Sequence, residues 1–129
     1  MNKGILITGA ILGALAVILG AFGAHGLKNL VEPEAVKTFE TGVKYQMYHA
    51  LLLLFVGGNT LLSTSTKNTI MYLVIAGVIL FSGSIYGLST NNLTSFDFRK
   101  IGFITPIGGA LLIAAWGVLI YKFVQLRNV

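Results

Sequence analysis

Long runs without a charged residue alternate with short charged segments along this chain. Four such runs are present, at residues 4–27, 45–66, 68–96 and 101–121. A helix needs roughly 20 mostly apolar residues to cross the hydrocarbon core of a bilayer, and every run is long enough. Because backbone amides in lipid must bond within their own segment, we expect helices and not open strands. The pattern predicts four membrane-spanning helices, at 4–24, 45–62, 70–88 and 101–121.

The first run, GILITGAILGALAVILGAFGA, has features of a signal peptide. Ala21 and Gly23 are small residues of the kind found at a cleavage site. The run extends for 21 residues without a charge, however, and the apolar region of a signal peptide usually has about 7–15. We therefore expect this segment to be retained as the first span.

A polar segment with helical periodicity precedes the second run. Pro33 suits the first turn of a helix. Apolar residues follow at spacings of three and four, at Val36, Phe39, Val43 and Met47. Opposite charges stand at ion-pair spacing, Glu34 with Lys37 and Glu40 with Lys44. The segment is predicted to be an amphipathic helix that lies on the membrane surface between spans one and two. A plain polar loop is the alternative.

The composition agrees with a membrane protein. Of 129 residues, 55% are apolar and 10% are charged, whereas a soluble domain carries about 25% charged residues. The absence of cysteine excludes disulfides and thiolate metal sites. The net charge is +5, but the basic residues are scattered, which argues against a nucleic-acid partner. We expect one all-α integral membrane domain, residues 1–129, with the lipid bilayer as its partner.

The charged residues give limited information on sidedness. With four spans, both termini lie on one side, together with Lys3, Lys67, Lys122 and Arg127. The opposite side carries Lys28, Lys37, Lys44, Arg99 and Lys100. The positive-inside rule counts these basic residues and returns nearly a tie. All four acids fall on the second side, so we favour cytoplasmic termini in a multi-pass protein of the cell membrane.

Small residues recur at helical spacing inside the spans. They are Gly9, Gly13, Ala16 and Gly20 in the first span, and Gly83 and Gly87 in the third. Such residues let helix backbones approach closely in lipid, where no hydrophobic effect drives helices together. We expect them to pack the bundle, with homo-oligomerisation as the alternative. Trp116 and Tyr121, toward the end of the fourth span, are typical of an aromatic belt.

The polar entry to the second span, KYQMYHALLLL, is the main candidate for a site. The candidate polar cluster comprises His25, Thr41, Tyr45, Gln46, Tyr48 and His49. His25 leaves span one and His49 enters span two, so the topology places both histidines near one membrane face. A pair of histidines can bind a metal or haem, but without carboxylate or cysteine support it is a weak ligand set, and we predict no metal or cofactor.

Two further hypotheses concern the same polar face. It could serve a small-solute or ion/proton carrier that uses His25, Gln46 and His49, although the middle of no span contains an acid or a base. In the hypothesis we favour, the tyrosines anchor at the headgroups while Gln46 and His49 bond to a neighbouring helix or water. The sequence has no paired carboxylates in a span, no nucleophile motif and no phosphate loop, so we expect no enzyme. The predicted function is a non-enzymatic packing or partner-binding membrane protein.

Two segments carry a resemblance to a known family. GAFGAHGLK at 20–28 and FETGVKYQMYHALLLL at 39–54 resemble the signatures of small membrane proteins grouped as domain-of-unknown-function family 423. The matching positions are Gly20, Phe22, Gly23, Ala24, His25 and Gly26, then Phe39, Thr41, Gly42, Tyr45, Gln46, Tyr48, His49 and Ala50. The resemblance covers essentially the whole chain. It implies a multi-pass protein of the bacterial plasma membrane and no particular reaction, ligand or substrate.

Overall fold

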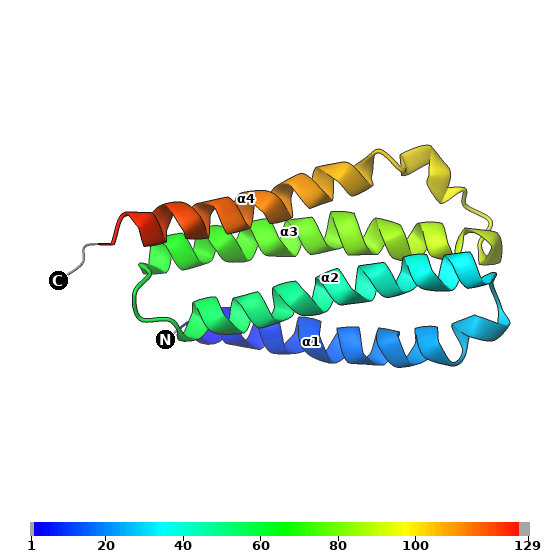
Figure 1. Cartoon of the computed structure of the whole chain (residues 1–129), viewed down its shortest axis with the longest axis horizontal. Coiled ribbons are helices and arrows are strands. Elements are labelled where there is room, and N and C mark those ends of the chain that lie inside the picture. The colour runs from blue at the N-terminus through cyan, green and yellow to red at the C-terminus, as the bar shows by residue number, and fades with distance from the viewer. Residues whose placement is uncertain (1, 127–129) are drawn as a thin grey trace.

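Four long helices form the protein in a computed structural model that describes residues 2–126 (Figure 1). They are α1 (Lys3–Ala24), α2 (Pro33–Gly58), α3 (Thr64–Ser89) and α4 (Ile104–Val124). Short 3-10 turns lie in the connections, at Leu27–Asn29, Asn91–Leu93 and Phe98–Ile101. The described residues contain no strand, and the predicted all-α class is confirmed.

Three helical segments within residues 2–126 are long and apolar enough to cross a membrane. They are Lys3–Asn29, Thr64–Ser89 and Ile104–Val124. The α2 helix has sufficient length, at 26 residues, but is not among them. Its first three turns carry charged residues, and these lower the hydropathy of the helix.

The predicted surface helix is not a separate element. The segment that begins at Pro33 continues without interruption to Gly58, so it forms the first turns of α2. The apolar stripe that we assigned to the membrane surface faces other helices instead. A Cβ atom at Gly23 of α1 would lie 3.0 Å from the Phe39 ring, and one at Gly20 would lie 3.4 Å from Val43. These contacts with α1 hold the segment in line with the rest of α2.

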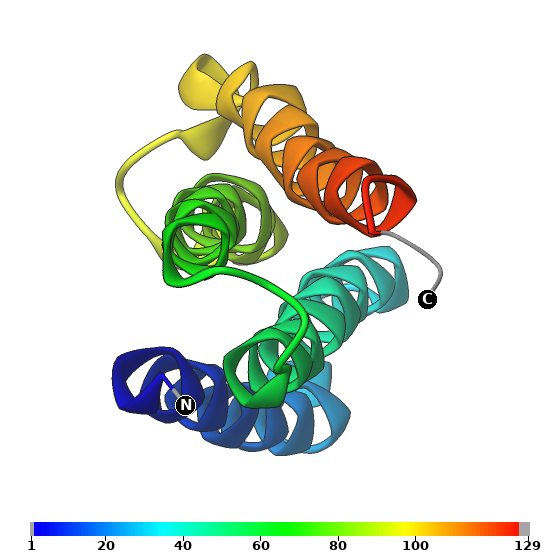
Figure 2. The same cartoon turned by 90° about the vertical axis from the view of Figure 1, so that its left-hand side faces the viewer.

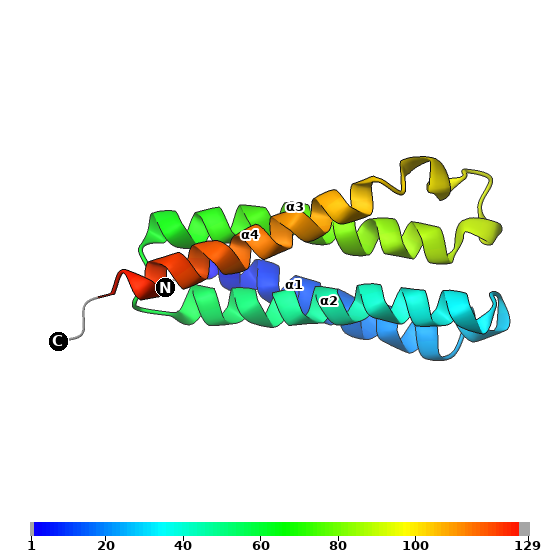
Figure 3. The ribbon, with the colours of Figure 1, turned by 45° about the horizontal axis from the view of Figure 1, so that its top comes forward.

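The helices are arranged in chain order, each antiparallel to the next (Figure 1). The contacts of α1 with α2 and of α3 with α4 are the most extensive, and α2 with α3 joins the two pairs. In an end view α1 and α4 lie on opposite sides, with α2 and α3 between them (Figure 2). Figure 3 shows α4 crossing α3 obliquely. The start of α1 and the end of α4 lie at the same end of the bundle. Arg127, which the charge count assigned to the side of the termini, is outside the described residues.

Glycines allow the closest helix contacts, and the most important ones lie outside the predicted stripes. A Cβ atom at Gly108 of α4 would overlap the backbone nitrogen of Phe81 in α3. At Gly77 a Cβ atom would lie 2.7 Å from Cγ of Leu112. At Gly42 of α2 it would lie 2.8 Å from the ring of Tyr86. Only a residue without a side chain fits at these crossings.

The glycines that we predicted to pack have different surroundings in the two helices. Cβ atoms at Gly9 and Gly13 of α1 would lie 3.1 and 3.7 Å from Leu53 and Ala50 of α2. Ala16 is buried on the same stripe, and Gly20 faces Val43 as described. Gly87 of α3 faces the ring of Phe98 in the connection to α4, whereas a Cβ atom at Gly83 would meet no atom within 4 Å.

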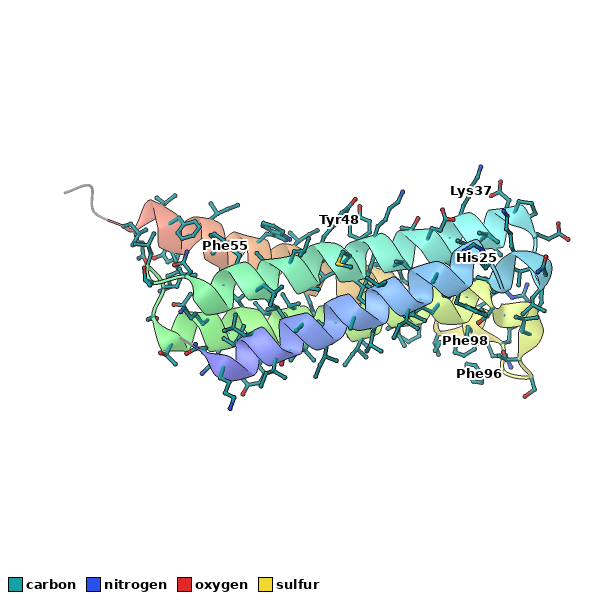
Figure 4. The ribbon with its side chains drawn as sticks, turned by 90° about the horizontal axis from the view of Figure 1, so that it is seen from below. His25, Lys37, Tyr48, Phe55, Phe96 and Phe98 are labelled. Carbon is teal, nitrogen blue, oxygen red and sulfur yellow. The ribbon has the colours of Figure 1, made fainter. Side chains whose placement is uncertain are left out.

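Hydrogen bonds fix the connection between α3 and α4. The Asn91 side chain donates to Asp97 and accepts from the backbone N–H of Phe98 at 2.7 Å. Arg99 forms an ion pair with Asp97, with Nε and Oδ1 3.0 Å apart. The hydrogen bonds that the Arg99 side chain and backbone donate lower the pKa of Asp97 to about 2, so the pair stays charged well into the acid range. This connection places the Phe98 ring against Gly87, and the ring lies at the end of the bundle (Figure 4).

We expect Gly108→Ala to destabilise the protein by about 1–3 kcal/mol, because the added methyl group forces α3 and α4 apart. Gly117→Ala, in the same helix, is the matched control, since a Cβ atom there would meet no atom within 4 Å. The measurement is thermal unfolding in detergent, followed by loss of the monodisperse elution peak. Equal unfolding temperatures for the two variants would contradict this account of the α3–α4 crossing.

Candidate functional site

The Gln46 side chain of α2 connects three helices. It is 4% exposed, and its Nε2 donates to the carbonyl of Leu12 in α1 at 2.9 Å. Its Oε1 accepts from the hydroxyl of Tyr86 in α3 at 2.7 Å. These two partners determine the orientation of the amide, since a carbonyl can only accept and the hydroxyl has a proton to donate. One amide therefore fixes α2 relative to both of its neighbours.

A second link joins α2 and α3 one turn away. The hydroxyl of Ser82, which is fully buried, donates to the carbonyl of Gly42 at 2.8 Å. Gly42 and Gln46 are four residues apart, as are Ser82 and Tyr86, so the two links lie side by side along the interface. Because Gly42 has no side chain, the Tyr86 ring can lie against the backbone of α2. The close approach and the hydrogen bonds thus depend on one another.

His49 connects α2 with α4. It is 3% exposed, and its Nε2 lies 3.1 Å from the indole Nε1 of Trp116. Its Nδ1 lies 2.6 Å from the carbonyl oxygen of Tyr45. An indole N–H can only donate, so Nε2 of His49 must accept, and the ring proton must be on Nδ1, which donates to Tyr45. Both ring nitrogens of His49 therefore have partners within the chain.

The partner of Trp116 differs from our prediction. We expected this indole in an aromatic belt at the headgroups, but its N–H is directed to His49 within the bundle. The two rings are edge to face, with centroids 6.1 Å apart. Tyr121, one turn nearer the end of α4, is exposed.

The structure does not bring His25 to His49. His25 follows the last turn of α1 and is exposed. Figure 4 shows it toward the same end of the bundle as Lys37, away from Tyr48. Gly23 lies against Phe39, and His49 is ten residues further along α2, about 15 Å at 1.5 Å per residue. The distance arises because α2 begins at Pro33, so His49 lies in the middle of the helix and not at its entry.

The remaining members of the candidate cluster are exposed. Thr41 is exposed and donates to the Lys37 carbonyl of its own helix at 3.2 Å. Tyr45 and Tyr48 are exposed, with ring centroids 5.5 Å apart. The structure therefore brings together Gln46, His49 and Tyr45, whose ring lies against Phe81 of α3 and lines a cavity with His49. It leaves His25, Thr41 and Tyr48 apart from them.

Several residues of this network were missed by sequence reasoning. Ser82, Tyr86 and Trp116 supply the partners of α2, together with the Leu12 carbonyl. Ser82 and Tyr86 did carry a signal, because they are polar residues one turn apart in an apolar run. The Leu12 carbonyl carried none, since a backbone acceptor has no counterpart in a side-chain pattern.

Two grooves flank the network on opposite sides of the bundle. The α1/α3 groove has a volume of about 330 Å³ and has Gln46 and Tyr86 at its floor. The α2/α4 groove has about 240 Å³ and contains His49 and Trp116. Apolar side chains form most of both walls. Among residues 2–126, no group of three or more His, Asp or Glu residues is placed to hold a metal ion.

Comparison with known proteins identifies relatives over nearly the whole chain. A family model described as Protein of unknown function (DUF423) matches residues 19–109. The UPF0382 membrane protein YwdK of Bacillus subtilis is 40% identical, over 95% of this chain and 98% of its own length. The UPF0382 membrane protein SSP2132 of Staphylococcus saprophyticus is 40% identical, over 92% of this chain and 94% of its own length. A UPF0382 membrane protein of Haemophilus influenzae is 38% identical, over 87% of this chain and 86% of its own length.

No solved structure matches this chain. The family match covers well over half of the sequence and includes both segments on which the resemblance depended. The chain therefore belongs to the family described as Protein of unknown function (DUF423), and it is a membrane protein, as are the relatives named UPF0382 membrane proteins.

Proposed function

We propose that this chain is a four-span protein of the cell membrane that binds a membrane-embedded partner and catalyses no reaction. The fourth crossing is α2, which lies along α1 from Phe39 against Gly23 to Gly57 against Leu6. These contacts extend over 18 residues of α2, or about 27 Å, close to the thickness of a hydrocarbon core. If α1 crosses the membrane, α2 crosses with it.

The side chains of α2 are compatible with this placement. Glu34 and Lys37 lie beyond the end of α1, outside the length that the two helices share. Lys44 is exposed, and its long side chain can reach the headgroups from within the span. Apolar residues of the second half, Leu51, Leu54 and Phe55, are exposed on the outer surface, as expected for contact with lipid. With both termini on one side, we place them in the cytoplasm.

Single cysteines test the crossing, because the chain has none of its own. Asn29→Cys lies between α1 and α2, and Thr60→Cys lies between α2 and α3; both positions are exposed. We expect an impermeant maleimide to label the two variants from opposite sides of the membrane, in intact cells and in inverted vesicles. Labelling of both from the same side would mean that α2 does not cross.

The buried polar groups support a structural role. The hydrogen-bonding groups of Gln46 and His49 are directed to Leu12, Tyr86, Tyr45 and Trp116. Each of these groups is therefore engaged in a contact within or between helices. The carrier hypothesis required His25, Gln46 and His49 on one face, but His25 lies at the end of the bundle. The arrangement favours a rigid helix bundle over a solute carrier.

A double-mutant cycle with Gln46→Leu and Tyr86→Phe measures the central link. Each variant keeps the approximate volume of the side chain and removes one partner of the 2.7 Å hydrogen bond. We expect a coupling energy of about 1 kcal/mol, between the average and the maximum found for hydrogen bonds between membrane helices. Reversible unfolding in mixed micelles gives the four free energies of unfolding. Additive effects would show that the bond does not stabilise the bundle.

The open α1/α3 groove is the observation that supports partner binding. Gly83 lies in it, and a Cβ atom there would meet no atom within 4 Å. Around it are apolar side chains from both helices, Leu12, Leu15, Ile18, Leu19, Val78 and Ile79. A glycine in such a groove lets the backbone of another transmembrane helix approach, as small residues do at helix interfaces. The occupant is a transmembrane helix, from a second copy or another membrane protein.

Photo-crosslinking in cells tests this groove. A benzophenone amino acid replaces Ile79 in the groove or, as control, Ile120 outside it; both positions are 63% exposed. We expect a protein adduct from position 79 only, and its loss in a Gly83→Leu background. The mass of the adduct distinguishes a second copy from another protein. Lipid adducts alone at both positions would contradict the proposal.

A further inference from the structure

A third groove lies between the start of α3 and the end of α4, separate from the network described above. Its volume is about 560 Å³. It is lined by Ser65, Thr66, Thr69, Ala114, Gly117, Val118, Tyr121 and Lys122. The hydroxyl groups and the ammonium group lie toward the end of the bundle, and the small and apolar residues lie deeper along α4. The groove thus has a polar and an apolar part.

The polar part of this groove is positively charged. Lys122 is half-buried there, and no ion pair involves it among residues 2–126. The first turn of α3 presents the positive end of the helix dipole beside it. Lys67, in the same turn of α3 but not lining the groove, is 6% exposed and likewise has no ion pair among the described residues. All four acidic side chains of the sequence belong to the segments at the opposite end of the bundle.

The hydroxyl group of Thr66 lines the groove and makes one side-chain hydrogen bond. The residue is 7% exposed, and its Oγ1 accepts from the Ser63 hydroxyl at 3.0 Å. The Ser63 oxygen in turn accepts from the backbone N–H of Thr66 at 3.2 Å. Thr69, one turn on, donates to the Ser65 carbonyl, but the Thr66 hydroxyl makes no such bond within residues 2–126. A hydroxyl can donate one hydrogen bond and accept two, so Thr66 keeps hydrogen-bonding capacity for a ligand in the groove.

We propose that this groove binds the phosphate group of an anionic phospholipid. Lys122 and the Thr66 hydroxyl are the groups that meet the phosphate oxygens. An acyl chain follows α4 past Gly117, where a Cβ atom would meet nothing within 4 Å, toward Ala114. Gly117 is five residues from Lys122, about 7.5 Å deeper. Tyr121, 60% exposed beside Lys122, is at the level of an interfacial aromatic residue.

The site depends only on α3 and α4, which are both apolar and long enough to cross the membrane. It is therefore independent of the crossing of α2 and of the α1/α3 partner groove. Failure of the cysteine or crosslinking experiments would leave it unaffected.

Native mass spectrometry of the full chain in a mild detergent provides the test. The protein is titrated with phosphatidylglycerol and, separately, with phosphatidylcholine of the same acyl chains. Gly117→Leu fills the apolar part of the groove, and Gly4→Leu, outside every groove described above, is its matched control, because a Cβ atom at either position meets nothing within 4 Å. Lys122→Gln removes the charge, and Lys100→Gln does the same at the opposite end of the bundle.

We expect one phosphatidylglycerol to bind in preference to phosphatidylcholine. Lys122→Gln should weaken its binding about fivefold, the effect of one basic residue near an anionic headgroup. Gly117→Leu should abolish the adduct, Thr66→Val should reduce it, and Gly4→Leu and Lys100→Gln should leave it unchanged.

Three results would overturn the proposal. The first is equal binding of the two lipids, and the second is full phosphatidylglycerol binding by Gly117→Leu. The third is displacement of the lipid by millimolar inorganic phosphate or glycerol 3-phosphate, which would identify a site for a soluble phosphate and not for a lipid.

Discussion

The bundle depends on one buried amide. Gln46 donates to α1 and accepts from α3, so a single side chain sets the positions of both neighbours of α2. In a bilayer the hydrophobic effect does not drive helices together, and van der Waals packing and interhelical hydrogen bonds determine which helices associate. The polar residues that looked like an unusual entry to a span are thus, in large part, the residues that hold the span in place.

The hydrogen bonds and the glycines stabilise the same helix contacts together. The hydroxyl of Ser82 can reach the carbonyl of Gly42 only because the backbone of α2 is uncovered there, and the Tyr86 ring lies in the same space. Between α3 and α4, the backbones meet at Gly108, and the hydroxyl groups of Ser84 and Thr105 are hydrogen-bonded across the same interface. The bond from Trp116 to His49 also connects α4 to α2. Each helix pair is therefore fixed by close packing together with a polar link nearby.

The sequence was sufficient for the helical class and for three of the apolar helices, because charge-free runs of this length have few other structures available in lipid. It placed the helix ends less well. The α3 helix begins at Thr64, six residues before the predicted span, because Ser63 caps a polar first turn that a hydropathy pattern ignores. The α2 helix begins at Pro33, which suits a first helical turn, and its amphipathic stripe faces α1 and, through Phe39, Tyr86 of α3. Periodicity identified that stripe but could not say whether it faces lipid headgroups or other helices.

The candidate site was predicted in part for the same reason. Gln46 and His49 were recognised as polar residues in an apolar context. Their partners on the other helices, however, are 34, 40 and 67 residues away along the chain. His25 was grouped with them on the assumption that both histidines lie at the boundary of a span. Once α2 is seen to begin at Pro33, the helix carries His49 to mid-bundle and leaves His25 at the end. The length of a helix, and not the chemistry of its residues, thus decides which polar groups can share a site.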